Sequence, residues 1–172
     1  EMLDGTAFDW NDPVKAAHPF ENRDERLLAT VLMNGVLFKG KRIATYPGGA
    51  DAMPNPNATK TGYYLRKFLN ENVNIQTGGG SDGHVVPLFR LAEIYLNYAE
   101  ALNEYDPTNP DIAVYLNKIR ERVSLPDVPS GLTQEQMRTL IHHERRVELA
   151  FEEHRFWDVR RWKVASSTLG AP

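Results

Sequence analysis

The chain has 172 residues, of which 41% are hydrophobic and 25% are charged, and its formal net charge is −3. This length allows a substantial core, and the composition is that of a globular protein rather than a disordered chain. The slightly acidic balance gives no general attraction to phosphate backbones, so we expect no nucleic-acid partner. No apolar run reaches the roughly 18 residues that cross a bilayer, and the lack of cysteine excludes disulfides and thiol catalysis.

Prolines and glycines concentrate in the first half of the chain, which is therefore predicted to be rich in loops. Residues 26–38 are mostly apolar and are interrupted by Asn34-Gly35, a dipeptide typical of two-residue hairpin turns, so we predict a short β-hairpin there. Residues 46–59 have the proline, glycine and asparagine content of a surface loop. Residues 77–83 are glycine-rich and are predicted to form a second, flexible loop.

From Pro87 onward the apolar residues follow a helical period, which predicts a first helix that ends near Tyr105. Its buried face is expected to comprise Leu91, Ile94, Tyr95, Tyr98, Ala101 and Leu102. Asn109 is a suitable cap and Pro110 a suitable first residue for a second helix, which should run to about Val123. The second helix is expected to bury Ile112, Leu116, Ile119 and Val123.

The spacing Thr133-x-x-Gln136 is a capping box, so a third helix is predicted to start there. Its apolar surface is expected to comprise Met137, Leu140, Ile141, Val147, Ala150 and Phe151. A break near Glu153-His154 should precede a last helical segment that ends near Trp162.

Antiparallel helix pairs of this size are the unit of tetratricopeptide-like solenoids. The predicted fold class is therefore mostly α, with tetratricopeptide-like helical hairpins after a loop-rich N-terminal half that contains a short β-hairpin. We predict a division into residues 1–86, which hold the candidate ligand-facing loops, and residues 87–172, which form the helical segment.

Five segments carry a family resemblance, in order along the chain. Two lie upstream, at residues 22–27 (NRDERL) and 61–68 (TGYYLRKF). Three lie in the predicted helices, at residues 90–101 (RLAEIYLNYAEA), 116–122 (LNKIRER) and 144–152 (ERRVELAFE), the last followed by Arg155, Asp158 and Arg160-Arg161-Trp162. Together they span nearly the whole chain and resemble the SusD/RagB family of surface glycan-binding lipoproteins, and five segments in order are more specific than any one of them.

This resemblance implies a non-enzymatic protein at the outer-membrane surface of a Bacteroidetes-type bacterium, which passes oligosaccharides to a SusC-like TonB-dependent transporter and needs no cofactor. It also implies that helix pairs form the scaffold while loops carry the glycan site. Family members are several-fold longer and begin with a lipidated cysteine after a signal peptide. We therefore expect this chain to correspond to their C-terminal third, with the lipid anchor upstream of it.

Acidic and basic residues cluster toward the end of the chain. Glu144 and Glu148 are four residues apart and share a helix face, as the carboxylate pair of a glycosidase could. Nearby arginines would keep both acids ionised, so we interpret the cluster as structural and predict no catalytic residue. The predicted ion-pair cluster comprises Glu144, Glu148, Arg145, Arg155 and Asp158. The adjacent His142 and His143 would point about 100° apart on a helix, so no metal site is predicted.

A glycan site needs an exposed aromatic platform with polar side chains beside it, because sugars present apolar C–H faces and a rim of hydroxyls. Trp10 with Asn11, and Tyr46 at the mouth of its loop, are the candidate ligand-binding residues. The alternative for Trp10 is burial against the helices, which is usual for an isolated tryptophan. Tyr95 and Tyr98 are expected to pack in the core because they lie at helical spacing.

The function that these observations favour is capture of oligosaccharides without bond chemistry. One alternative is a scaffold or interaction module of the same complex that has no ligand site of its own. A glycoside hydrolase is the third alternative.

Overall fold

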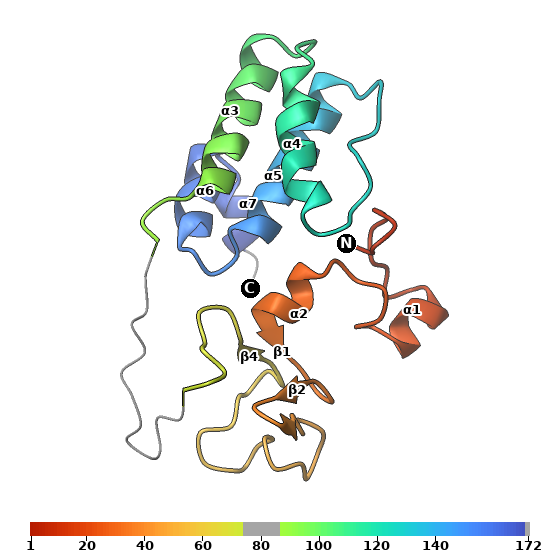
Figure 1. Cartoon of the computed structure of the whole chain (residues 1–172), viewed down its shortest axis with the longest axis vertical. Helices are drawn as coiled ribbons and strands as arrows, with labels where there is room; N and C mark the ends of the chain where they lie inside the picture. Colours follow the sequence, from red (N-terminus) through yellow and green to blue (C-terminus); the bar gives the residue numbers. More distant parts are fainter. Residues whose placement is uncertain (74–86, 171–172) are drawn as a thin grey trace. The chain divides into compact units, whose positions relative to one another are not determined.

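A computed structural model describes residues 1–73 and 87–170 of the chain (Figure 1). The elements in chain order are α1 (Pro13–Ala17), α2 (Arg26–Thr30), β1 (Val31–Leu32), β2 (Leu37–Phe38), β3 (Lys41–Arg42), β4 (Tyr64–Leu65), α3 (Leu91–Tyr105), α4 (Asp111–Glu121), α5 (Gln134–Glu148), α6 (His154–Arg161) and α7 (Ala165–Leu169). The fold class is mostly α with small two-stranded sheets, which confirms the predicted class. The predicted loop at 77–83 lies outside the described residues.

The chain forms two compact units. We call residues 1–26 together with those from Leu88 onward the helical unit, and residues 27–87 the loop unit. The sequence predicted consecutive segments 1–86 and 87–172, whereas the structure groups the first 26 residues with the helices. Ion pairs between this N-terminal segment and α5, described below, explain the grouping.

The core of the helical unit is built by α3, which contacts both α4 and α5. Figure 1 shows α3 and α4 side by side, joined at one end by a short turn. The buried cluster comprises Leu96, Ala99, Ile112, Leu116, Ile119, Val128, Ile141 and Leu149. The predicted stripe of the second helix is therefore confirmed, since Ile112, Leu116 and Ile119 lie in this cluster and Val123 is also buried.

The helix boundaries follow the predicted caps. The Thr133 side chain accepts from the backbone N–H of Gln136, and the Gln136 side chain accepts from the backbone N–H of Thr133, so the capping box of α5 is confirmed. Asn109 accepts a hydrogen bond from the N–H of Asp111 at 3.1 Å, at the start of α4. Glu153, the residue before α6, has φ 65, and this left-handed conformation separates α6 from the segment that precedes it.

The predicted buried face of α3 is correct only in part, since Tyr95 and Leu102 are partly buried against the core cluster. The residues of α3 that are buried are Leu96, Ala99, Glu100 and Asn103. Leu91, Ile94 and Tyr98 are instead exposed. Tyr98 and Tyr95 both pack edge-on against Tyr115 of α4. The face of α3 that packs inward carries Leu96 and Ala99 together with the polar residues Glu100 and Asn103.

The predicted hairpin exists in the loop unit but at a different place. Strand β2 pairs with β3, and the turn between them is Lys39-Gly40, with φ 49 and φ 76. Two successive residues at positive φ are the requirement of a type I′ hairpin turn. Of the predicted turn residues only Gly35 has positive φ. Strand β1 pairs instead with the distant β4, so residues 26–38 form a helix and two strands of different sheets.

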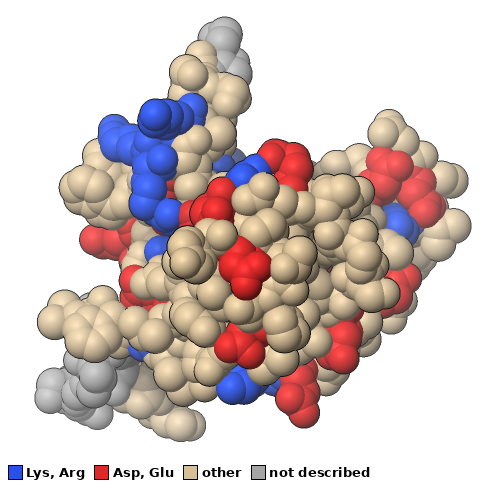
Figure 2. All heavy atoms as spheres, turned by 90° about the horizontal axis from the view of Figure 1, so that it is seen from above, with Lys and Arg blue, Asp and Glu red and all other residues tan. Residues whose placement is uncertain are grey.

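The surface of the described residues carries both signs of charge. On the face shown in Figure 2, many of the basic side chains gather at one edge, while acidic side chains are scattered over the rest among uncharged surface, so this face has no uniform basic field of the kind that attracts nucleic acid. Among the residues described, no helix combines the length and the apolar character needed to cross a membrane.

Candidate functional site

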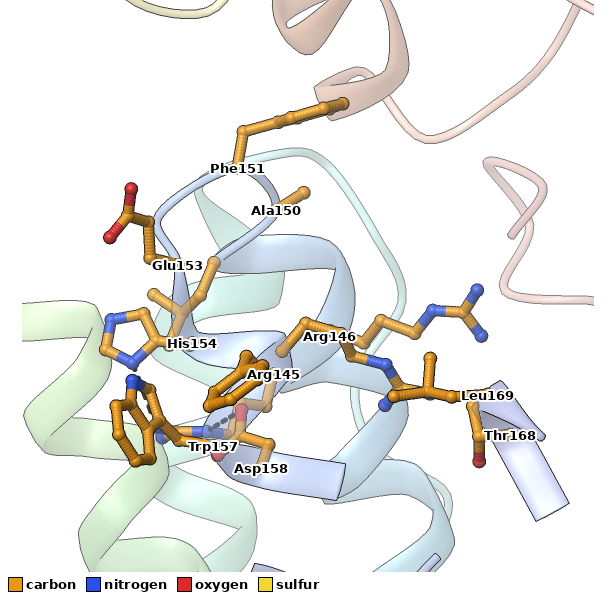
Figure 3. A pocket seen from close by; sticks show the side chains of 13 residues that line it. Arg145, Arg146, Ala150, Phe151, Glu153, His154, Trp157, Asp158, Thr168 and Leu169 are labelled. Carbon is orange, nitrogen blue, oxygen red and sulfur yellow. Dashed lines mark hydrogen bonds and ion pairs between the residues drawn. The ribbon is translucent and has the colours of Figure 1, made fainter. Parts of the chain in front are cut away.

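A hollow of about 1040 Å³ opens in the helical unit between the end of α5, the following turn, α6 and α7. Its apolar lining includes Phe156, Trp157 and Leu169, which are 51%, 67% and 59% exposed. Figure 3 shows His154 and Trp157 on the side of the hollow nearer α3, and Arg146 with Leu169 on the side of α7.

The turn between α5 and α6 gives this hollow its shape. Phe151 and Glu153 both have positive φ, of 63 and 65. Residues other than glycine adopt this left-handed backbone conformation at a cost of about 1–3 kcal/mol each, and only where the surrounding structure maintains it. Phe151 was predicted to belong to the apolar surface of the third helix, but the reversal of the chain leaves its side chain 58% exposed.

Three arginines line the hollow, and only one of them has a carboxylate partner. The Nε of Arg145 donates to Asp158 Oδ2 at 2.8 Å, and both side chains are buried. Neither the Arg146 side chain nor the Arg155 side chain has a hydrogen bond or ion pair within the described part of the chain. The sequence assigned Arg155 to the ion-pair cluster, but the turn before α6 directs it to this hollow.

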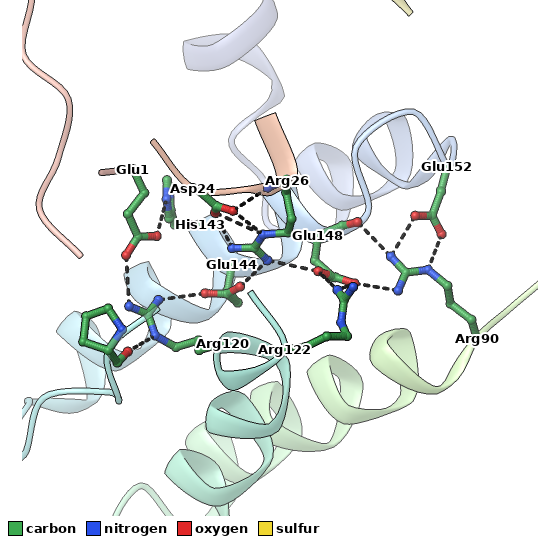
Figure 4. A network of polar contacts seen from close by, with 11 residues as sticks. Glu1, Asp24, Arg26, Arg90, Arg120, Arg122, His143, Glu144, Glu148 and Glu152 are labelled. Carbon is green, nitrogen blue, oxygen red and sulfur yellow. Dashed lines mark hydrogen bonds and ion pairs between the residues drawn. The ribbon is translucent and has the colours of Figure 1, made fainter. Parts of the chain in front are cut away.

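The carboxylates Glu144 and Glu148 lie in a buried network of ion pairs, shown in Figure 4. Glu144 is 0% exposed; its Oε1 accepts from Arg26 and its Oε2 accepts from Arg120 Nη1 at 2.9 Å. Arg26 also binds Asp24 through its Nε, at 3.0 Å to each carboxylate oxygen. The segment before α2 is thereby tied to the middle of α5.

Glu148 is 3% exposed and is contacted by arginines at the start of α2, just before α3 and just after α4. It accepts from Arg26 at 3.0 Å, from Arg90 at 2.6 Å and from Arg122 at 2.6 and 2.7 Å. Burial would raise the pKa of Glu148, but the hydrogen bonds and charges of these arginines outweigh burial and hold the pKa below its ordinary value. Arg90 extends the network to Glu152 at 2.7 and 2.8 Å.

The partners of these acids differ from those expected from the sequence. We expected arginines adjacent in the chain, in α5 and α6, to hold Glu144 and Glu148. The arginines that do so are Arg26, Arg90, Arg120 and Arg122. The signal for them is present in the sequence as arginines at helix ends, but sequence periodicity does not identify long-range partners.

A second group of polar contacts joins α3 to α6. Glu100 of α3 accepts hydrogen bonds from Arg161 and from Trp162 Nε1, the latter at 2.8 Å. The ring of His142 stacks on Trp162 with centroids 3.6 Å apart. His143 lies instead 3.4 Å from Glu1. Among the described residues, no group of three or more His, Cys, Asp or Glu side chains is arranged to hold a metal ion.

Trp10 is 66% exposed, so it is not buried against the helices. The Phe8 ring contacts it edge-on with centroids 4.8 Å apart, and the Arg23 guanidinium lies 4.3 Å from the Phe8 centroid. Asp9 Oδ1 accepts from both the backbone N–H and the side-chain amide of Asn11, at 2.8 and 3.0 Å. An exposed indole therefore stands beside a fixed polar side chain.

Tyr46 belongs to the loop unit and is 57% exposed. Its backbone carbonyl accepts from Gly49 at 2.8 Å, which closes a tight turn. The Asn55 side chain donates to Gly49 O at 2.9 Å and braces the same loop. Residues 46–59 contain no helix or strand, as predicted for a surface loop.

The fold is that of a mostly helical protein built on antiparallel helix pairs, and its sequence matches the SusD family over residues 1–172. The chain belongs to the SusD family. It is 36% identical over 126 residues to SusD-like protein P2 of Formosa agariphila. The aligned region covers 69% of this chain and 24% of that relative.

Two solved structures from Bacteroides fragilis are similar to the chain. A SusD-like protein superposes with a TM-score of 0.80 at 32% identity, covering 97% of this chain and 35% of that one. A SusD-like carbohydrate binding protein superposes with a TM-score of 0.83 at 32% identity, covering 97% of this chain and 34% of that one. The chain thus spans about a third of these structures and about a quarter of the relative from Formosa.

Proposed function

We propose that this chain serves in the non-enzymatic capture of oligosaccharides at the outer-membrane surface and in their delivery to a SusC-like TonB-dependent transporter. Membership of the SusD family supports this proposal, as does similarity to a protein described as carbohydrate binding.

The observation that carries the proposal is the exposure of Trp10. An indole that is 66% exposed presents a flat apolar face to solvent, the surface on which the C–H face of a sugar stacks. The T-shaped contact with Phe8 fixes the ring, and Asn11 beside it offers directed hydrogen bonds to hydroxyls. In the loop unit, Tyr46 is a second exposed aromatic with the same chemistry.

The glycosidase alternative has no support from Glu144 and Glu148. A glycosidase carboxylate must reach the glycosidic oxygen, and one of the pair needs a raised pKa to act as an acid. Both residues are buried, and the arginines that engage Glu148 lower its pKa. This pair is therefore suited to holding α5 in place.

One feature favours the scaffold alternative. Leu91, Ile94 and Tyr98 form an exposed apolar stripe on α3, with exposed fractions of 61%, 48% and 41%. Exposed apolar stripes of this kind commonly pack against a further protein surface. A pure scaffold would give no saturable binding of sugar, so one measurement separates the two functions.

We therefore expect isothermal titration of the protein with a panel of oligosaccharides to yield a saturable heat for at least one of them. Trp10→Ala should weaken that binding by about 1–3 kcal/mol, the scale of losing one aromatic stacking contact. Tyr105→Ala is the matched control, since Tyr105 is an aromatic that is 90% exposed at the end of α3. Equal affinity of the parent and Trp10→Ala would remove Trp10 from the site, and absence of heat across the panel would favour the scaffold.

A further inference from the structure

The side chains of two arginines that line the hollow beside α6 and α7 have no partner among the residues described, whereas most arginines of the helical unit contact a carboxylate. Carboxylates contact Arg26, Arg90, Arg120, Arg122, Arg138, Arg145 and Arg161. Arg146 and Arg155 both line the hollow, and their side chains have no hydrogen bond or ion pair among the residues described. A guanidinium group that has no carboxylate partner can bind an oxyanion from outside the protein.

The two arginines line the same hollow, and the charge of one acts on the other. Partial burial lowers the pKa of Arg155, and the charge of Arg146 lowers it further, while Asp158 opposes both effects. Asp158 cannot neutralise the pair, because Arg145 and Arg161 already engage its two oxygens at 2.8 and 3.1 Å. A bound anion would relieve the repulsion between the two cations.

The rest of the lining indicates what kind of anion fits. Trp157 and Leu169 offer exposed apolar surface, and Thr168 adds a hydroxyl group. Figure 3 shows Arg146 together with Thr168 and Leu169 on one side, and Trp157 across the hollow. A volume of about 1040 Å³ lies at the upper end of ordinary small-molecule sites, so a sugar ring has room between these walls.

We propose that this hollow is a second binding site, which takes an acidic sugar unit whose carboxylate or sulfate group is bound by Arg146 and Arg155 while its ring lies against Trp157. The sugar part of this inference rests on the proposed function. Guanidinium forks bind carboxylate and sulfate oxygens through two parallel hydrogen bonds. The aromatic wall supplies the apolar contact that a free inorganic anion cannot use.

The test is a titration of the 15N-labelled protein with glucuronate, glucose 6-sulfate, glucose and inorganic sulfate, followed through the indole N–H resonance of Trp157. Trp157→Phe assigns this resonance among the three tryptophans. We expect the two acidic sugars to shift it in a saturable way and with weaker affinity at high salt. Glucose should bind more weakly, and so should inorganic sulfate, since each lacks one of the two contacts.

Arg146→Gln combined with Arg155→Gln should weaken binding of the acidic sugars by about tenfold or more, as expected for lost charged hydrogen bonds. Lys41→Gln combined with Lys60→Gln is the matched control, because it removes the same charge from two exposed lysines of the loop unit. Replacing both arginines by lysine should give an intermediate loss, since charge remains without the fork. Neither arginine holds another element, so we expect all these variants to remain folded.

An unchanged Trp157 resonance with both acidic sugars would overturn the inference, as would equal affinity of the double glutamine variant and the parent. Inorganic sulfate binding as tightly as glucose 6-sulfate would also overturn it, because the aromatic wall would then contribute nothing. The proposed function fails separately, through loss of heat with every oligosaccharide of the panel. Binding of neutral oligosaccharides that depends on Trp10 would uphold that function whatever happens at Arg146 and Arg155.

Discussion

Glu148 is the single residue on which most charged contacts converge. Three arginines hold its carboxylate at distances of 2.6 to 3.0 Å, and the residue is 3% exposed. Glu148→Ala would deprive the buried Arg26 of one of its counter-charges, so we expect a loss of about 3–5 kcal/mol in the free energy of unfolding. Urea denaturation followed by circular dichroism measures this loss.

An ion pair on the surface provides the control for that measurement. Glu104 pairs with Arg138 at 2.6 Å, but its side chain is 47% exposed. Solvent screens such a pair, so Glu104→Ala should leave the urea midpoint almost unchanged. Similar midpoints for Glu148→Ala and Glu104→Ala would show that the buried network contributes no more than a surface pair.

At the scale of one helix, the capping box of α5 should have a measurable effect. Thr133 accepts from the N–H of Gln136 at 3.2 Å, which satisfies a backbone donor that the helix leaves open. Thr133→Ala removes this acceptor and should cost about 1 kcal/mol of stability. Thr139→Ala makes the same substitution inside α5 and should cost less, since alanine favours the helix interior. A smaller loss at Thr133 than at Thr139 would contradict a role of the cap.

The helices could be predicted from the sequence more reliably than the packing of their faces. The period and the caps placed α3, α4, α5 and α6 close to their observed bounds. The inward face of α3 was predicted only in part, because it includes the polar residues Glu100 and Asn103, which a periodicity of apolar residues leaves out. The position of the hairpin was also wrong, because Asn34-Gly35 satisfies the composition of a turn while the pairing of β1 with β4 is determined by distant residues.

At the scale of the whole chain, the contacts that could not be predicted are those between residues far apart in sequence. Arg26 and Glu144 are separated by 118 positions, and Arg90 and Glu148 by 58. Composition identified a balanced set of charges but not the partners, which depend on how the helices pack. The candidate residues Trp10 and Tyr46 followed from the chemistry of sugar recognition and stay predictions. That Arg146 and Arg155 have no side-chain partner among the described residues became visible only in three dimensions.

Acidification tests how these dispersed carboxylates act together. Asp24, Glu100 and Glu148 have pKa values below their ordinary ones of 3.8 for Asp and 4.5 for Glu, because interactions with arginines, and for Glu100 also with His142 and Trp162, outweigh the effect of burial. Below the ordinary pKa values the unfolded chain then binds more protons than the folded one, so acid favours unfolding.

We therefore expect their contribution to the free energy of unfolding to be constant above about pH 5.5, to fall once the pH drops below 4.5, and to be lost as the pH passes the folded-state values. Urea titrations at a series of pH values measure this decline. Glu100→Gln removes one of the titrating groups, so its curve should be less steep than that of the parent. Parallel curves for the two proteins would mean that Glu100 titrates alike in the folded and unfolded states, contrary to its burial beside Arg161.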